Sequence, residues 1–250
     1  MKSPEGEDRK PEQQSGDVQW LKAADVRSYR RGQTIVKTGS ELAEWVAISQ
    51  GAACLVSKVA TDTRVAVAAL WLGDVIGWGS PLGKLASRYD VTALVDVTTI
   101  SIPLGRVPPP DPHRPSDTAQ LCEATEARLQ DQITMRLAGN GLQRLVSVLA
   151  TLATALTSDN PEAQQAGSFA LPISQACIGD LSGLSRRQAW ILLGQLAEQG
   201  WLRTSKTKLT LEGLGSWLGL MGEVERTGLD CIASAEQCAA TLARLARPGR

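Results

Sequence analysis

The chain has 250 residues, of which 43% are hydrophobic and 21% are charged; this composition is typical of a folded protein and excludes a fibrous or wholly disordered chain. Lys and Arg together number 26, as do Asp and Glu, and the zero net charge disfavours a protein that coats nucleic acid or anionic membranes non-specifically. No apolar run of about 18 residues occurs, so no membrane contact is expected. The polar, acidic segment 1–18 is predicted to be a disordered tail.

Cysteine and histidine usage argues against an enzyme or a metalloprotein. The five cysteines include no C-x-x-C pair, and His113 is the only histidine. These residues offer little material for nucleophilic catalysis or a multi-histidine metal site, so no catalytic residue, metal ligand or cofactor is predicted. Unclustered cysteines are typical of the reducing cytoplasm, where we expect the protein to be.

Residues 19–107 are predicted to form a first, β-rich domain. Short apolar runs typical of strands recur from residue 26 to residue 103, separated by turn signals about every dozen residues. The turns include Arg31-Gly32, Thr38-Gly39 and Gln50-Gly51. This spacing favours a compact antiparallel barrel or sandwich.

Residues 108–157 are predicted to form a proline-rich linker, a long helix and a hinge. Five prolines lie between Val107 and Pro115, and Ser116 or Asp117 can cap a helix that runs towards Ala138. Gly139-Asn140-Gly141 is expected to break this helix. A second, strongly amphipathic helix then carries apolar residues at three- and four-residue steps from residue 142 to residue 156.

Residues 158–212 have the pattern of a winged helix-turn-helix. A polar loop over 162–168 precedes a helix over 174–181, a glycine-containing turn, a helix over 185–199 and a hairpin over 201–211. Between residues 185 and 211 the positive side chains outnumber the negative ones by four in an otherwise neutral chain. Residues 213–250 are predicted to be a helical extension, ending in an amphipathic helix from about residue 234 to residue 247.

These segments resemble the CRP/FNR superfamily of bacterial transcription regulators. The spacing of Gly39, Gly51, Gly73 and Gly77 is similar to the glycine frame of the cyclic-nucleotide-binding β-roll, and the run 173–186 is similar to the helix-turn-helix of the family. The resemblance implies an α+β fold with an N-terminal antiparallel β-roll, a long central dimerisation helix and a C-terminal winged helix-turn-helix. It also implies a homodimer that binds double-stranded DNA at a palindromic operator and contacts RNA polymerase.

The second helix of the motif is predicted to read DNA. Arg186 matches the base-reading arginine of the family, and a guanidinium pairs bidentately with guanine. The other residues assigned to this interface are small, polar, basic or apolar groups on the same motif and its wing: Ser174, Ser185, Arg187, Gln188, Ile191, Lys206 and Lys208. Both serines are expected to act first as helix N-caps, and Ile191 has two equally supported roles, core packing and contact with a thymine methyl group.

An effector pocket is expected around five residues of the β-roll: Trp71, Gly77, Trp78, Ser87 and Arg88. Family members that bind cyclic AMP have a glutamate after the second glycine and an Arg-Ser or Arg-Thr pair for the phosphate. This chain has Trp78 and Ser87-Arg88 at those places. Because an indole is a hydrogen-bond donor only, Trp78 cannot accept a bond from a ribose hydroxyl. A cyclic nucleotide is therefore not predicted as the effector. The sequence instead predicts an effector of unknown identity, or no effector.

Two further hypotheses remain open from the sequence. Within the same class, the protein could be a regulator without an effector, whose activity follows its abundance. In a different class, it could be a signalling or scaffold module that has lost DNA binding and acts through the extension 213–250.

Overall fold

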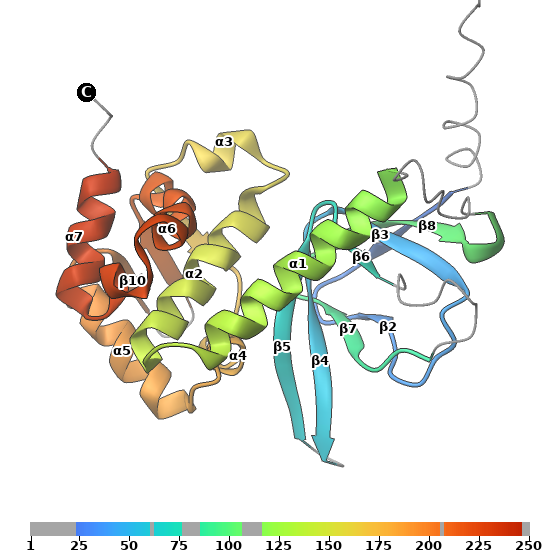
Figure 1. Cartoon of the computed structure of the whole chain (residues 1–250), viewed down its shortest axis with the longest axis horizontal. Coiled ribbons are helices and arrows are strands. Elements are labelled where there is room, and N and C mark those ends of the chain that lie inside the picture. The colour runs from blue at the N-terminus through green and yellow to red at the C-terminus, as the bar shows by residue number, and fades with distance from the viewer. Residues whose placement is uncertain (1–23, 61–62, 77–85, 107–116, 206–207, 247–250) are drawn as a thin grey trace, which may run out of the picture.

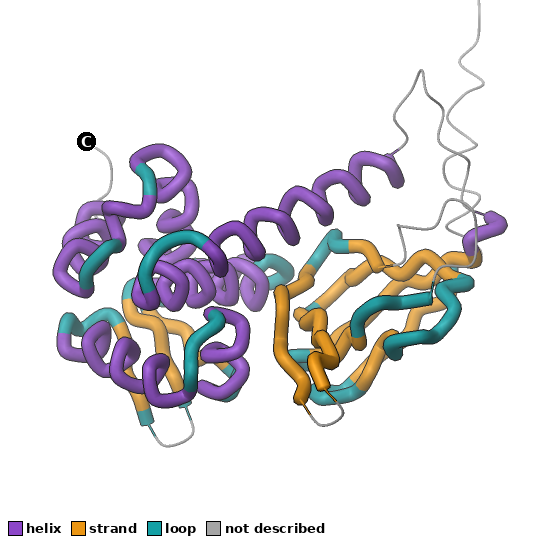
Figure 2. Tube along the Cα trace, turned by 60° about the horizontal axis from the view of Figure 1, so that its bottom comes forward, coloured by secondary structure: helices purple, strands orange, loops and turns teal. Residues whose placement is uncertain are grey.

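The structure is a computed structural model that describes residues 24–60, 63–76, 86–106, 117–205 and 208–246. The predicted tail and the proline-rich linker lie outside these residues. The fold is α+β, with antiparallel sheets in the N-terminal part and helices in the C-terminal part, as the sequence predicts. Helix α1 (Asp117–Leu137) joins the two parts, lying beside the sheets and ending at the helices (Figures 1 and 2).

The N-terminal part contains two four-stranded antiparallel sheets. One has the order β1-β8-β3-β6 and consists of β1 (Asp25–Tyr29), β8 (Val97–Pro103), β3 (Glu44–Gln50) and β6 (Val75–Ile76). The other has the order β2-β7-β4-β5 and consists of β2 (Thr34–Val36), β7 (Asp90–Ala93), β4 (Ala52–Ala60) and β5 (Thr63–Trp71). A 3₁₀ turn, η2 (Leu104–Arg106), follows β8.

Both sheets contribute to one apolar core. Ile48, Leu70 and Val91 come from β3, β5 and β7, and each is only 1% exposed. The β3–β4 turn requires glycine at position 51, where φ is +80° and an added Cβ would lie 2.1 Å from the backbone oxygen of Asp96. The predicted roll is thus closed by a turn that only glycine fits.

Helix α1 packs along β5, the edge strand of its sheet. The side-chain amide of Gln132 accepts a hydrogen bond from the backbone N–H of Ala69 at 2.7 Å and donates one to the oxygen of Ala69 at 2.9 Å. Arg136 donates to the oxygen of Ala66 at 3.0 Å. The helix therefore satisfies edge groups that a neighbouring strand would otherwise pair.

Helix α2 (Gly141–Thr157) begins where the sequence predicts a break. Asn140 is its N-cap, and its side chain accepts a bond from the N–H of Gln143 at 3.0 Å, while the side chain of Gln143 accepts the N–H of Asn140 at 2.6 Å. This reciprocal capping box fixes the start of the helix. The buried face of α2, which includes Leu145, Leu149 and Leu152 at 0% exposure, is the centre of the C-terminal core.

The remaining elements surround α2. They are α3 (Pro161–Gln164), β9 (Ser168–Leu171), α4 (Gln175–Ser182), α5 (Arg186–Glu198), β10 (Leu202–Thr204), β11 (Leu209–Glu212), α6 (Leu214–Thr227), η3 (Leu229–Ile232) and α7 (Ala235–Leu245). The predicted loop over 162–168 is wrong in part. Asn160 and Pro161 start the short helix α3, and β9 joins β10 and β11 in a three-stranded sheet of order β10-β11-β9. The partner of β9 is some forty residues away along the chain, so local sequence patterns did not reveal it.

The extension after β11 is part of the C-terminal core. Trp217, Leu220, Cys238 and Leu242 have 0% exposure, and the Trp217 indole donates to the oxygen of Glu212 at 3.0 Å. Helix α6 packs on α2, and α7 packs on α6 and α5. None of the described helices combines the length and the apolar composition needed to cross a bilayer.

Candidate nucleic-acid interface

Helices α4 and α5 form the predicted helix-turn-helix, and serines cap both of them. The hydroxyl of Ser174 accepts a bond from the N–H of Cys177 at 3.2 Å, and that of Ser185 accepts one from the N–H of Gln188 at 3.3 Å. Gln188 completes a capping box by accepting the N–H of Ser185 at 3.1 Å. The predicted capping roles are confirmed, and the Gln188 carbonyl oxygen is engaged in the cap.

The turn between the helices depends on Gly183. This residue has φ +62° and ends α4, and its N–H donates to the oxygen of Asp180 at 3.0 Å. Buried Ala189, Leu193 and Leu196 then hold α5 on the core. Leu192, on the same side of the helix, is half-buried.

The outward face of α5 carries two arginines and two large apolar residues. Arg186, Arg187 and Gln188 are exposed, and so are Trp190 at 68% and Ile191 at 44%. Arg186, Arg187, Trp190 and Ile191 line one groove with Thr204 and Ser205 of the β10–β11 hairpin. Of the two roles considered for Ile191, the structure places it on the open face. The groove has cations at the start of α5 and apolar groups one turn further on.

Trp190 was not among the residues predicted for this interface. It lies four residues after Arg186 and three after Arg187, so helical periodicity places it on the same face. A tryptophan is usually assigned to a core by default, and its exposure became evident only once the buried face of α5 was defined.

The wing carries fewer free charges than its sequence suggests. Arg203 forms an ion pair with Glu212 on the adjacent strand. Lys208 is exposed at the hairpin, where its backbone N–H donates to the Ser205 hydroxyl at 3.0 Å. Lys206 lies outside the described residues. Arg186, Arg187 and Lys208 are therefore the described basic groups of the interface without an ion pair in the described part of the chain.

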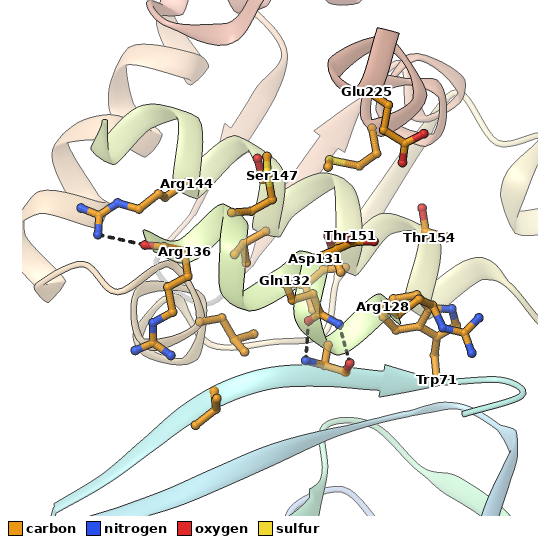
Figure 3. Close-up of a pocket in the computed structure, with 17 residues that line it drawn as sticks. Trp71, Arg128, Asp131, Gln132, Arg136, Arg144, Ser147, Thr151, Thr154 and Glu225 are labelled. Carbon is orange, nitrogen blue, oxygen red and sulfur yellow. Dashed lines mark hydrogen bonds between the residues drawn. The ribbon is translucent and has the colours of Figure 1, made fainter. Parts of the chain in front are cut away.

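The residues predicted for an effector pocket do not meet in one described site. Gly77 and Trp78 lie outside the described residues. The Ser87 hydroxyl donates to the oxygen of Tyr89 at 2.6 Å, and Arg88 is exposed beside it. Trp71 instead lines a cavity between β5, α1, α2 and α6, which includes neither Ser87 nor Arg88 (Figure 3).

At this cavity Trp71 is part of a polar cluster with Arg128 and Asp74. The Arg128 guanidinium lies 5.3 Å from the centre of a Trp71 ring and pairs with the carboxylate of Asp74. Asp74 also accepts the N–H of Trp71 at 2.7 Å and is only 1% exposed. Burial raises the pKa of Asp74, while the Trp71 N–H and the Arg128 charge act against this rise.

Comparison with known proteins identifies the N-terminal part. Residues 26–107 match the family model of the cyclic nucleotide-binding domain. A search of curated proteins finds no match. Among solved structures, a CRP/FNR-family transcriptional regulator from Thermus thermophilus is similar over 84% of this chain and 98% of its own, at 18% identity and a TM-score of 0.59. The chain has the CRP/FNR fold.

Two other solved structures support this assignment of the fold. FixK2 from Bradyrhizobium japonicum is similar over 79% of this chain and 96% of its own, with 21% identity and a TM-score of 0.55. The c-di-GMP-responsive global regulator CLP from Xanthomonas campestris is similar over 77% of this chain and 96% of its own, with 16% identity and a TM-score of 0.56. The CRP/FNR fold thus accounts for most of the chain.

In this CRP/FNR fold, two cysteines meet between the cyclic nucleotide-binding domain and the helix-turn-helix. Cys54 of β4 is buried, whereas Cys177 of α4 is half-buried. A hydrogen bond between the two thiols raises the pKa of Cys54 and lowers that of Cys177. The described residues contain no group of three or more His, Cys, Asp or Glu side chains placed to hold a metal ion.

Proposed function

We propose that this protein is a sequence-specific DNA-binding regulator of transcription of the CRP/FNR type. The observation that carries the proposal is the outward face of α5, where exposed Arg186, Arg187, Trp190 and Ile191 lie beside the wing on a helix that is capped and held by a buried face. A helix held in this way can enter the major groove with its N-terminal residues at the base edges. Arg186 is the residue to pair with guanine, and Lys208 contacts a backbone phosphate.

Trp190 adds an apolar component to this recognition. Its exposed ring and the neighbouring Ile191 side chain are suited to thymine methyl groups and to sugars in the groove. Because Arg187 and Ile191 stand where the family has acidic and polar residues, the operator differs from the TGTGA-type half-site.

The active form is a homodimer joined along α1 that binds a palindromic operator and contacts RNA polymerase in the bacterial cytoplasm. Ile133 and Leu137, one turn apart on α1, are 41% and 82% exposed, which supports a partner helix over this surface. A two-fold dimer places two α5 helices at half-sites about one helical turn apart.

We do not propose cyclic AMP as the effector, because Trp78 stands where a ribose acceptor is needed. The alternative, a scaffold that docks partners through residues 213–250, has less support. The apolar face of α6 and α7 that would dock a partner is buried against α2 and within the extension itself. DNA binding therefore stays the preferred function.

The test is selection of DNA sequences from a random pool on the purified protein, followed by fluorescence anisotropy of the enriched site across a salt series. We expect a palindrome whose affinity falls as salt rises, because phosphate contacts release counterions. Arg186→Ala should weaken binding by about tenfold to hundredfold, since a bidentate base contact contributes about 1–3 kcal/mol of discrimination.

Arg64→Ala is the matched control, because Arg64 is 62% exposed in the β4–β5 hairpin, away from α5. Its affinity for the enriched site should equal that of the unmodified protein. Failure to enrich any sequence, with and without a cell extract that supplies metabolites, would contradict the proposal and favour the scaffold.

A further inference from the structure

A cavity at the junction of the two parts of the molecule is not accounted for by DNA binding. It has a volume of about 210 Å³ and lies between β5, α1, α2 and α6, outside the β-roll core (Figure 3). We call it the junction cavity. Its volume is smaller than the ~300–1,000 Å³ of pockets for drug-sized ligands, so it suits a small molecule.

Much of the lining of the junction cavity is apolar, although polar side chains, among them the carboxylates of Asp131 and Glu225, also line it (Figure 3). Its apolar wall is formed by side chains from all four elements and from α4: Val67, Ala69, Met135, Val148, Leu152, Leu181 and Met221. Two of these are methionines, whose flexible side chains adapt to ligands of different shape. This apolar wall would bury the hydrocarbon part of a ligand.

One end of the junction cavity holds two arginines that lack carboxylate partners. Arg136 and Arg144 lie together there, whereas Arg128 lies at the other end beside Trp71 (Figure 3). Arg128 pairs with Asp74, but neither Arg136 nor Arg144 forms an ion pair in the described part of the chain. We call Arg136 and Arg144 the arginine pair.

The hydrogen bonds of the arginine pair are few and mostly long. Arg136 donates to the oxygen of Ala66 at 3.0 Å, and Arg144 donates to the backbone oxygens of Arg136 and Gly183 at 3.5 Å each; the buried Nε of Arg144 has no partner among the described residues. Burial lowers the pKa of Arg136; the charge of Asp180 opposes this effect, and the charge of Arg144 makes a smaller contribution that adds to it. Two neighbouring, partly buried cations are costly unless an anion joins them.

We propose that the junction cavity binds a small organic carboxylate. Its carboxylate group lies between Arg136 and Arg144, which supply the unused guanidinium donors, and its apolar body lies against the apolar wall. The planar guanidinium matches the two oxygens of a carboxylate, and a short hydrocarbon chain or one ring fits the volume. Inorganic anions would lack the contact with the apolar wall.

The arginine pair also touches the turn of the helix-turn-helix. An added Cβ at Gly183 would lie 3.1 Å from Arg136 Nε and 3.5 Å from an Arg144 terminal nitrogen. A carboxylate on the arginine pair therefore changes the contacts that hold this turn. Occupancy of the junction cavity therefore alters the affinity for the operator. This coupling rests on the proposed function, whereas the carboxylate site itself does not.

Isothermal titration calorimetry of the full-length protein without DNA tests the site. The probes are hexanoate, its neutral amide hexanamide, benzoate and inorganic phosphate. We expect hexanoate or benzoate to bind, and hexanamide and phosphate to bind more weakly by about tenfold or more. Hexanamide loses the charge-assisted hydrogen bonds, and phosphate loses the apolar contact. Arg144→Gln should weaken carboxylate binding to a similar extent.

Two further variants keep the test decisive. Arg106→Gln replaces an exposed arginine away from the junction cavity and should leave binding unchanged. Val148→Phe fills the cavity while keeping both arginines, and should abolish binding without lowering the melting temperature by more than a few degrees. Equal binding of hexanoate and hexanamide, unchanged binding by Arg144→Gln, or no binding of either carboxylate at tens of millimolar would overturn the proposal.

The effect on the operator is measured separately, by anisotropy with the enriched DNA in the presence of the bound carboxylate. Calorimetric binding with no change in operator affinity would leave the site intact and overturn only its coupling to DNA. Absence of operator binding under all conditions would contradict the proposed function but not the carboxylate site.

Discussion

Single glycines set the local backbone geometry at two turns. Gly51 fits a β3–β4 turn that no Cβ can enter, and Gly183 shapes the turn between α4 and α5. At Gly183 a side chain would be unfavourable for two reasons: the backbone is left-handed, and an added Cβ would contact the arginine pair. Residues such as these are the points where one side-chain carbon decides whether the local structure forms.

Gly183→Ala should lower the free energy of unfolding by about 1–2 kcal/mol, because an L-residue at φ +62° is strained and the Cβ approaches Arg136. Urea unfolding followed by circular dichroism measures this change. The control is Gly222→Ala, which lies inside α6 with no atom within 4 Å of the added Cβ and should raise stability by up to about 1 kcal/mol. Equal effects of the two substitutions would refute the argument.

At the scale of elements, helices in this protein complete structures that begin elsewhere. Helix α1 pairs with the open edge of β5 through Gln132, and α6 is joined to α7 through Glu223. In both cases one polar side chain links segments that pack together. The strength of each link can be measured by removing that side chain alone.

Gln132→Leu should cost about 1–3 kcal/mol of stability, because it leaves the backbone N–H and oxygen of Ala69 without partners in a partly buried place. Gln130→Leu, at an exposed position of the same helix, should change stability by less than about 0.5 kcal/mol. Chemical unfolding of both variants checks the difference. A loss of the same size in both would mean that the edge pairing contributes nothing.

Acid should weaken the attachment of α7. Hydrogen bonds from Arg244 and Arg226, at 2.6 and 2.7 Å, lower the pKa of Glu223 to about 2. Because the pKa of Glu223 in the folded state lies below its unfolded value, the contribution of ionised Glu223 to stability is complete above about pH 5. This contribution is lost as the pH falls towards 2.

Glu223→Gln should therefore melt at a lower temperature than the unmodified protein at pH 7, and the two melting temperatures should converge near pH 2. Differential scanning calorimetry across this range measures both curves. Glu225→Gln, an exposed neighbour on α6 without an ion pair in the described part of the chain, is the control and should track the unmodified protein at every pH. A constant gap between the Glu223→Gln and unmodified curves would show that ionisation of Glu223 is not involved.

At the scale of the whole molecule, the two parts are packed together rather than tethered by a linker alone. The carboxylate of Asp159 accepts the N–H of Gly51 at 3.0 Å, and Cys54, Ala66 and Ala69 of the β-roll belong to the same apolar cluster as α2 and α4. Helix α1 contacts both parts and keeps apolar residues exposed. The proposed dimer contact uses this exposed surface.

Replacing both Ile133 and Leu137 with Glu should convert the proposed dimer to a monomer, because like charges would face each other across the α1–α1 contact. Sedimentation equilibrium should then give the mass of one chain, 26.6 kDa, and operator binding should weaken. Val59→Glu, at a 68% exposed apolar position on β4, should remain dimeric. A dimer that survives the double substitution would place the interface elsewhere.

The sequence alone determined the succession of a β-rich part, a long helix and a helix-turn-helix, both helix caps of that motif and the basic start of α5. These features depend on local rules, namely helical periodicity, capping by Ser174 and Ser185, and the turn at Gly183. Only the tertiary structure decided that β9 completes the wing sheet, that Trp190 is exposed and that Arg136 and Arg144 meet at the junction cavity. Periodicity states which residues share a face, but the choice of what that face meets depends on packing between segments far apart in the chain.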